Sequence, residues 1–406
     1  MDKLISLIGL MVMIGIAYLV SDNKKAVNWK LVGIGVAMQL VFGLLILKWA
    51  PGQSLFNVLN DLVTKLLDFT KEGTAFLFGN MLDVESFGFI FALQILPTII
   101  FFSALMAVLY HLGVMEKIIT VLAKIMSKLL GTSGAESLSA AANIFVGQTE
   151  APLVIKPFIK TMTKSELLTV MTGGMATVAG GVMAGYVSMG VEAGHLIAAS
   201  IMSAPASLII AKIMVPETQT PVTKGKVNIQ LDELDANVID AAARGTSEGL
   251  KLALNVGAML LSFIAIVALV NAVIGWVGSV VGMDYLSLEW ILGRLFAPLA
   301  YLMGVPLPDA VEAGNLLGQK VVINEFFAYA NLSELIKSNA LSERTVIILT
   351  YALCGFANFS SIGIQVGGIG SLAPERRSDI AKLGIKALIG GSLAAFMTAT
   401  VAGMLI

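Results

Sequence analysis

The sequence has very little cysteine, histidine and charge. Cys354 is its one cysteine, which excludes an internal disulfide and any cysteine-based zinc or iron–sulfur site. The two histidines, His111 and His195, have no metal-ligand partner at helical spacing, so we expect both to be packing or interfacial residues. The chain also has no HExxH metalloprotease motif, and Cys354 has no evident partner histidine. These absences argue against an enzyme.

Charged residues make up 13% of the 406 residues, while 57% are hydrophobic. A soluble domain carries roughly 25% charged residues, which keep it solvated. The formal net charge of −1 gives no field that would attract nucleic acid, so we expect no nucleic-acid partner. The composition therefore predicts an all-α polytopic membrane protein that is surrounded by lipid.

The apolar runs predict about eight transmembrane helices, because one span needs about 20 apolar residues. The first run has no small-residue cleavage site before Ser21, so we interpret it as a helix and not as a signal peptide. The sixth is long enough to require a strong tilt or a kink. The runs cover residues 4–20, 31–49, 87–111, 166–190, 194–215, 248–282, 344–370 and 380–406.

Three further stretches carry charged residues among apolar ones at helical spacing. These are residues 56–69, 115–131 and 288–304, and this pattern is typical of helices that lie in the membrane interface.

Lysine and arginine gather in loops that eight spans would place on one side of the membrane, which should be the cytoplasmic side. They lie in residues 24–30, 117–164 and 376–382. Both termini of this multi-pass chain would then face away from the cytoplasm. The acidic stretch 216–244 falls on the same inner side although its charge is opposite.

Residues 143–155, NIFVGQTEAPLVI, place polar side chains between two apolar arms that are too short to cross a bilayer. The ten residues 137–146 make about 15 Å of helix. Irregular backbone at membrane depth is tolerated only inside protein or beside a wet cavity. We therefore predict a re-entrant hairpin, with Thr149 or Glu150 as the N-cap of the second arm and Pro152 in its first turn.

A second part of the chain repeats this plan. NLLGQ at 315–319 echoes NIFVGQ at 143–148, and Glu325 corresponds roughly to Glu150. Each hairpin is followed by a span that a small-residue stretch interrupts, at 173–181 and at 354–361. The predicted orientation inverts one repeat relative to the other, and paired interrupted segments in inverted repeats indicate a transporter's binding site near the midplane.

These repeats divide the chain into four predicted parts. Three spans and an interfacial helix form an N-terminal scaffold, and a polar loop with the long sixth span separates the two transport repeats. Each transport repeat contains an interfacial helix, a hairpin and two spans. The parts are residues 1–114 (scaffold), 115–215 (first repeat), 216–287 (loop and long span) and 288–406 (second repeat).

Four separated motifs closely resemble the concentrative nucleoside transporters in their bacterial form. They are GQTEAPLVIKPF, GGMATVAGG, NEFFAY and CGFANFSSIGI, and the resemblance runs over essentially the whole chain. It implies eight transmembrane helices, two opposed re-entrant hairpins and a homotrimer. It also implies a secondary active symporter that imports nucleosides such as uridine by an elevator-type motion, with sodium, or in some members protons, as the coupling ion.

The resemblance also assigns roles to individual residues. Those that would contact the nucleobase or the ribose are Gln148, Thr149, Glu150, Val182, Glu325, Phe356, Asn358 and Ser361. Those that would bind sodium, by side chain or by carbonyl, are Asn143, Val146, Thr177 and Val178.

The residue types suit a nucleoside on chemical grounds as well. The Glu325 carboxylate can accept both hydroxyls of a ribose diol, and Gln148 offers a base both a donor and an acceptor. Stacking on Phe356 would contribute about 1–3 kcal/mol. Simpler roles remain open for single residues, since Glu150 could be only an N-cap and Asn358 only a packing residue.

Two functional alternatives also remain open. A channel could use the same hairpins, with both repeats lining a continuous pore, and saturable, gradient-driven uptake would separate it from a carrier. A carrier of the same fold could couple to protons through Glu150 or Glu325.

Overall fold

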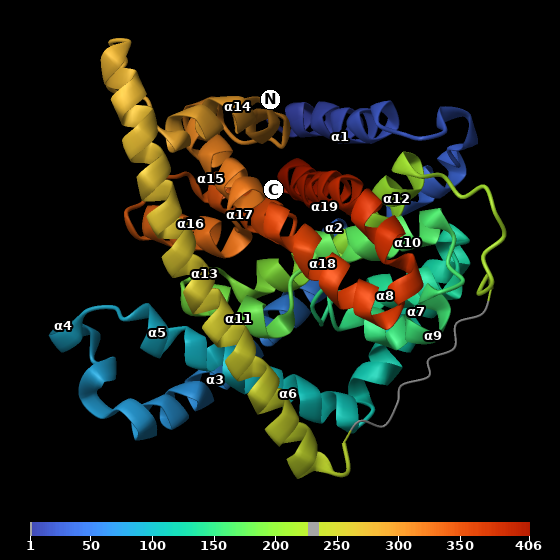
Figure 1. Ribbon diagram of the computed structural model, residues 1–406, viewed down its shortest axis with the longest axis horizontal. Coiled ribbons are helices and arrows are strands. Elements are labelled where there is room, and N and C mark those ends of the chain that lie inside the picture. Colours follow the sequence, from blue (N-terminus) through green and yellow to red (C-terminus); the bar gives the residue numbers. More distant parts are fainter. Residues whose placement is uncertain (1, 226–234) are drawn as a thin grey trace.

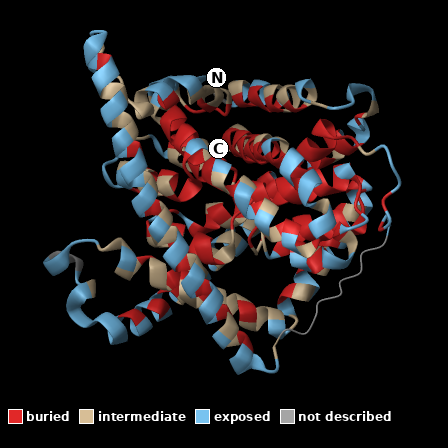
Figure 2. Cartoon of the chain, in the orientation of Figure 1, coloured by how far each residue is buried: buried red, intermediate tan, exposed pale blue. Residues whose placement is uncertain are grey.

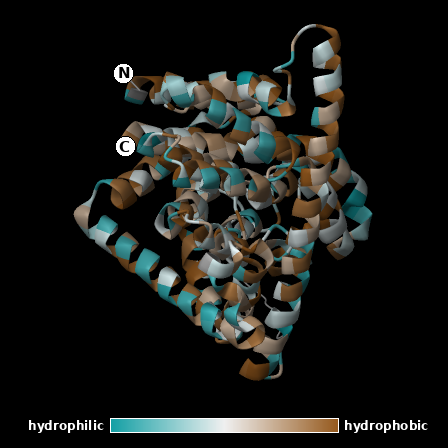
Figure 3. Ribbon diagram, turned by 90° about the vertical axis from the view of Figure 1, so that its left-hand side faces the viewer, coloured by the Kyte–Doolittle hydropathy of each residue, from teal (hydrophilic) through white to brown (hydrophobic). Residues whose placement is uncertain are grey.

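The computed structural model describes residues 2–225 and 235–406, and within them the chain is helical, with one isolated bridge between Ser133 and Lys224 (Figure 1). Figure 2 shows buried residues in the middle of the molecule and exposed ones on the outer helices. Hydrophobic residues also occur on the outer helices (Figure 3), as expected for a protein surrounded by lipid.

The eight predicted spans are matched one for one among the described residues. Six helical segments are long and apolar enough to cross a membrane, and two shorter apolar helices, Lys3–Leu19 and Phe359–Leu372, fall on the other two predicted runs. The six are Trp29–Leu47, Phe91–His111, Lys164–Ser188, Ala193–Met214, Val238–Val280 and Pro374–Leu405.

The predicted N-terminal scaffold contains α1 (Asp2–Leu19), α2 (Trp29–Leu47), α3 (Ala50–Phe78) and α6 (Leu96–His111), and the predicted long sixth span corresponds to α13 (Val238–Val280). The amphipathic stretch 56–69 is thus the middle of a much longer helix than we predicted. Short elements complete this part: η1 (Lys24–Ala26), η2 (Gly79–Leu82), α4 (Val84–Phe87) and α5 (Phe91–Gln94).

Helix α13 is one uninterrupted helix of 43 residues, which begins ten residues before the predicted run. At 1.5 Å per residue it is about 65 Å long, twice the thickness of the hydrocarbon core. Gly249 lets it approach α6 closely, because a Cβ there would lie 2.8 Å from the Ile100 Cα. Most of its other apolar side chains are exposed, for example Leu254 and Leu261.

The two predicted repeats each contain six α-helices in sequence, while their 3₁₀ helices fall at different places. The first contains α7 (Val114–Leu130), α8 (Gly134–Ala142), η3 (Ala151–Ile155), α9 (Lys156–Ile159), α10 (Lys164–Ala176), α11 (Gly180–Ser188) and α12 (Ala193–Met214). The second contains α14 (Leu288–Leu302), η4 (Leu307–Asp309), α15 (Ala310–Val322), α16 (Glu325–Lys337), α17 (Glu343–Leu353), α18 (Phe359–Leu372), η5 (Pro374–Arg376) and α19 (Arg377–Leu405).

The two predicted helix interruptions are present. Residues 177–179 separate α10 from α11, and residues 354–358 separate α17 from α18. The buried core forms where the repeats interlock, since α10 packs on α19 and α17 packs on α12 as well as on α19. Each broken helix therefore contacts the long helix of the other repeat.

The first hairpin differs from the prediction in its second arm. That arm begins as the 3₁₀ helix η3 and not as an α-helix, with Pro152 in its first turn as predicted. Glu150 occupies the N-cap position, but no side chain caps the arm, so the predicted capping bond of Thr149 or Glu150 is wrong. The reason is local. Pro152 has no N–H that could donate to a capping side chain, and the Thr149 hydroxyl donates to Glu150 Oε1 instead (2.9 Å).

Candidate functional site

The two broken helices meet at their interruptions. The Phe356 N–H donates to the Thr177 carbonyl across a distance of 3.2 Å. Gly355, with φ +151°, packs directly on the other break, because a Cβ at this position would lie 2.8 Å from the Met175 carbonyl oxygen. The first hairpin joins the first break through a bond from the Gly180 N–H to the Phe145 carbonyl, and the second hairpin joins the second break through a bond from Asn358 to Glu325. Residues far apart in the sequence therefore come together here.

A buried carboxylate marks the second-repeat side of this junction. Glu325 is the first residue of α16, after the N-cap Asn324, and is 5% exposed. Its Oε2 accepts a hydrogen bond from Asn358 Nδ2 (2.8 Å), and its Oε1 accepts one from the Tyr186 hydroxyl (3.3 Å). Asn358 is also the N-cap of α18, where its Oδ1 accepts from the Ser361 N–H (2.9 Å). Glu325, Asn358 and Ser361 thus form one connected group.

The first hairpin joins this group through Gln148. Its Nε2 donates to Ser361 Oγ (3.0 Å), while its buried Oε1 has no hydrogen-bond partner among the described residues. Gly174 of α10 allows this approach, because a Cβ there would lie 2.8 Å from the Gln148 Cβ. A hydrogen-bonded chain therefore runs from the first hairpin through α18 to Glu325 of the second.

The side chains of the other predicted substrate residues lie around this hydrogen-bonded group, and the Phe356 carbonyl accepts from the Asn358 N–H (2.9 Å). Val182 is buried on α11, and Phe356 is half-buried at the break that precedes α18. Thr149 is half-buried and packs against Gly368 of α18, whereas Glu150 is exposed. The Glu150 carboxylate thus lies at the rim of the site, and the Glu325 carboxylate lies inside it.

The predicted sodium ligands lie where two helices end. Asn143 is the C-cap of α8 and Thr177 the C-cap of α10. The Gly180 N–H donates to the Phe145 carbonyl (3.0 Å), which joins the two turns that contain Val146 and Val178. The C-terminal ends of both helices, with their negative dipoles, therefore lie beside one small region.

The donor set in this region suits a hard monovalent cation. Asn143 Nδ2 donates to the Ser139 carbonyl (2.9 Å), which leaves its buried Oδ1 without a partner among the described residues. A buried unpaired oxygen is rare and calls for an explanation. The Thr177 hydroxyl donates to the Gly173 carbonyl (3.0 Å), so its lone pairs remain free to accept a cation. No group of three or more histidine, cysteine or acidic side chains that could hold a metal occurs in the described part of the chain.

Three buried polar residues of this region escaped the sequence analysis. Tyr186 donates to Glu325 and stacks on Tyr329, with a centroid distance of 4.2 Å. Gln365 donates to the Met171 carbonyl (2.9 Å) beside Gly174. Lys320 is completely buried. Only Lys320 carried a usable signal, because a lysine within an apolar hairpin arm is expensive and rarely lacks a role.

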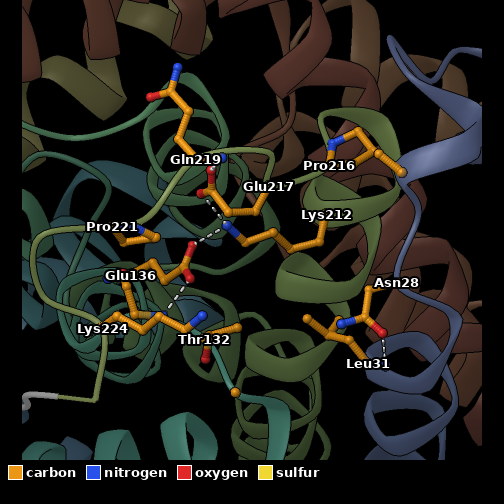
Figure 4. A pocket seen from close by; sticks show the side chains of 13 residues that line it. Asn28, Leu31, Thr132, Glu136, Lys212, Pro216, Glu217, Gln219, Pro221 and Lys224 are labelled. Carbon is orange, nitrogen blue, oxygen red and sulfur yellow. Dashed lines mark hydrogen bonds and ion pairs between the residues drawn. The ribbon is translucent and has the colours of Figure 1, made fainter.

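A separate polar cluster ties the base of the first hairpin to α12 (Figure 4). Lys212 is 6% exposed and pairs with Glu136 (2.7 Å) and Glu217 (3.4 Å) at a cavity of about 190 Å³. Ser133 and Glu136 form a capping box at the start of α8, and the Ser133 hydroxyl donates to Glu166 of α10 (2.6 Å). This cluster anchors the hairpin at the start of its first arm, at the opposite end of α8 from the tip.

Comparison with known families gives one consistent result. The family description "Na+ dependent nucleoside transporter C-terminus" matches residues 195–403, and its N-terminal counterpart matches residues 8–81. A third, "Nucleoside recognition", matches residues 92–193.

Individual relatives agree over the full chain. A Bacillus subtilis protein named uncharacterized transporter YutK is 49% identical, with 100% of both chains covered. The Helicobacter pylori nucleoside permease NupC is 45% identical over 100% of this chain and 98% of its own length. The rat sodium/nucleoside cotransporter 1 is 41% identical over 100% of this chain and 64% of its own length.

Among solved structures, CNTnw in an inward-facing substrate-bound state matches with a TM-score of 0.94 at 48% identity, covering 100% of this chain and 98% of that one. A CNTnw variant in an outward-facing state matches with a TM-score of 0.96 at the same identity and coverage.

Proposed function

The chain belongs to the concentrative, Na⁺-dependent nucleoside transporter family, and we propose that it imports nucleosides such as uridine by sodium-driven symport across the bacterial inner membrane. The observation that carries this proposal is the hydrogen-bonded chain from Gln148 through Ser361 and Asn358 to Glu325. It spans both repeats at the point where their broken helices meet, and a polar bridge of this kind can recognise a neutral ligand rich in hydroxyl and amide groups.

Each end of this hydrogen-bonded series of residues suits one part of a nucleoside. Glu325 would accept the ribose hydroxyls, held in orientation by Asn358 and Tyr186. The unpartnered Gln148 Oε1 would accept an N–H of the base. The remaining contacts would come from Thr149, Glu150, Val182, Phe356 and Ser361.

Coupling to sodium follows from the neighbouring helix ends. The Asn143 and Thr177 side chains, with the carbonyls of Val146 and Val178, would hold the ion, which supplies positive charge beside two helix C-termini. Binding of the sodium ion would fix the turn after α8, and therefore also the hairpin that carries Gln148. Linkage then requires nucleoside to tighten sodium binding by the same factor as sodium tightens nucleoside binding.

The wider assembly is inferred from membership of this family. We propose a homotrimer in lipid, with both termini in the periplasm and the two repeats moving as the elevator part against the scaffold. The exposed apolar length of α13 supports contact with lipid or neighbouring protomers. The division of the chain into scaffold and transport parts after residues 114, 215 and 287 is part of this proposal.

A proton-coupled symporter of the same fold is the second candidate. Two carboxylates lie at the junction of the repeats, Glu325 inside it and Glu150 at its rim, and either could carry a proton in place of the ion.

Uptake of radiolabelled uridine into proteoliposomes separates these candidates. An inward sodium gradient, an inward proton gradient and no gradient are compared for the wild type and for Asn143→Ala. We expect accumulation driven by sodium alone, with a marked loss of sodium dependence in Asn143→Ala.

Asn315→Ala is the matched control, because Asn315 is the sequence counterpart of Asn143 in the second repeat and is also buried. It should keep the sodium response of the wild type. An equal sodium response in Asn143→Ala and wild type would overturn the ion site, and accumulation driven by protons alone would favour the second candidate.

A further inference from the structure

Lys320 is a fully buried lysine that substrate recognition does not use. It lies in α15, the first arm of the second hairpin, with no exposed surface. A charged side chain at membrane depth costs several kcal/mol unless it is compensated. Its position therefore needs a reason beyond packing.

The contacts of Lys320 are those of a bound cation. Its Nζ donates to the carbonyl of Ala352, near the C-terminal end of α17, across 2.7 Å. It also lies 5.5 Å from the centre of the Phe396 ring of α19, within the range of a cation–π contact. Glu325, five residues further along the chain at the start of α16, supplies a buried carboxylate in the same hairpin. A helix C-terminus and an aromatic face thus lie against one positive charge, and the same hairpin contains a buried carboxylate.

The first repeat has a comparable place, which is built from the counterparts of the helices around Lys320. There the first hairpin arm α8, the end of the broken half-helix α10 and the long helix α12 come together at Asn143, Thr177 and Ser207. A Cβ on Gly173 would lie 3.3 Å from Asn143 Nδ2 and 3.7 Å from Ser207 Oγ. In the second repeat, Lys320 of α15 lies between the end of α17, at the Ala352 carbonyl, and the Phe396 ring of α19. The first place has neutral oxygens and an unpartnered Asn143 Oδ1, while the second contains an ammonium group.

We propose that Lys320 is a built-in cation, which takes in the second repeat the place that the coupling sodium ion takes in the first. This inference rests on the proposed sodium site. The tethered ammonium group compensates the C-terminal end of α17 and balances the charge of the buried Glu325 in the same hairpin, so this repeat needs no exchangeable ion. Lys320 is thus a positioning residue that sets the number of coupling ions per nucleoside.

The test converts the second place into a copy of the first. Lys320→Asn removes the ammonium group and supplies the type of ligand that Asn143 offers. Binding of ²²Na⁺ and of uridine is measured at equilibrium on purified protein. We expect bound sodium per protomer, and the Hill coefficient for sodium-dependent uridine binding, to rise from about one to about two.

Two controls separate this role from simple loss of a buried lysine. Lys320→Arg keeps the charge and should retain the sodium count of the wild type. Lys212→Asn removes a second lysine that is buried in the described part of the chain, where it pairs with Glu136 at the hairpin base, and it should also leave the count unchanged. A folded Lys320→Asn protein with the wild-type sodium count and Hill coefficient would overturn the proposal.

A second comparison covers the case in which Lys320→Asn does not fold. Lys320→Met combined with Glu325→Gln should recover folded, monodisperse protein that Lys320→Met alone loses, whereas Lys320→Met combined with Glu150→Gln should not. Equal recovery by both pairs, or by neither, would refute the charge compensation. If uridine binding to the wild type did not depend on sodium, the proposed sodium site would be refuted instead. The comparison of recovered folded protein would then still decide the role of Lys320.

Discussion

Asn358 has two roles that one substitution can separate. Its Oδ1 caps α18 by accepting from the Ser361 N–H, and its Nδ2 donates to Glu325 at 2.8 Å. Asn358→Ser keeps an N-cap oxygen, since serine caps helices about as well as asparagine, but its shorter side chain cannot reach Glu325. Asn358→Ala removes both interactions. The pair therefore isolates the hydrogen bond to the carboxylate.

The size of each effect follows from the interaction that is lost. A hydrogen bond to a charged group contributes about 1.5–3 kcal/mol, so Asn358→Ser should weaken uridine binding by about 10- to 150-fold. Asn358→Ala should weaken binding at least as much. It should also lower the free energy of unfolding by a further 0.5–2 kcal/mol or so, because α18 loses its cap.

Isothermal titration with uridine and thermal unfolding in detergent measure the two effects. Ser287→Ala, which removes the N-cap of α14 away from the site, is the control for capping alone and should lower stability without changing uridine affinity. Uridine affinity of Asn358→Ser within threefold of the wild type would refute the idea that Asn358 orients Glu325.

Three further outcomes test other parts of the site. Phe356→Ala should weaken uridine binding by about 1–3 kcal/mol if the ring stacks on the base, and an unchanged titration would exclude stacking. Glu325→Gln should abolish the preference for uridine over 2′,3′-dideoxyuridine in competition uptake, whereas a retained preference would place the ribose elsewhere. Gly355→Ala should greatly reduce folded protein in size-exclusion chromatography, because its Cβ would lie 2.8 Å from the Met175 carbonyl oxygen, while Gly363→Ala, with nothing within 4 Å, should not.

The sequence was sufficient to predict the parts of the fold that depend on local pattern. Run length and hydrophobicity located the spans, and the glycine-rich stretch at 173–181 and the residues 354–361 located the helix breaks. The 3₁₀ arm after Glu150 was missed, because ordinary helix patterns do not distinguish it and Pro152 suits both forms. The early start of α13 was missed because its first turns are polar and resemble a loop.

Prediction of the site was limited by contacts between repeats. The hydrogen bond between Gln148 and Ser361 joins residues 213 positions apart, and no rule based on residue spacing predicts it. Tyr186 is a further case, because a tyrosine in an apolar span resembles ordinary packing until its hydroxyl is found beside Glu325. The resemblance to a family supplied the residues of this group, and the structure supplied the order in which they are bonded.

The backbone bond between Phe356 and Thr177 has a consequence for how tightly ion and substrate can be linked. Under the sodium assignment proposed above, the Thr177 hydroxyl faces the ion while its carbonyl holds the amide of the aromatic residue next to the nucleoside. The path between the two ligands is then one residue long. An alteration of Thr177 made to change ion selectivity would therefore change substrate affinity as well, so the two specificities of this carrier could not be engineered independently at that position.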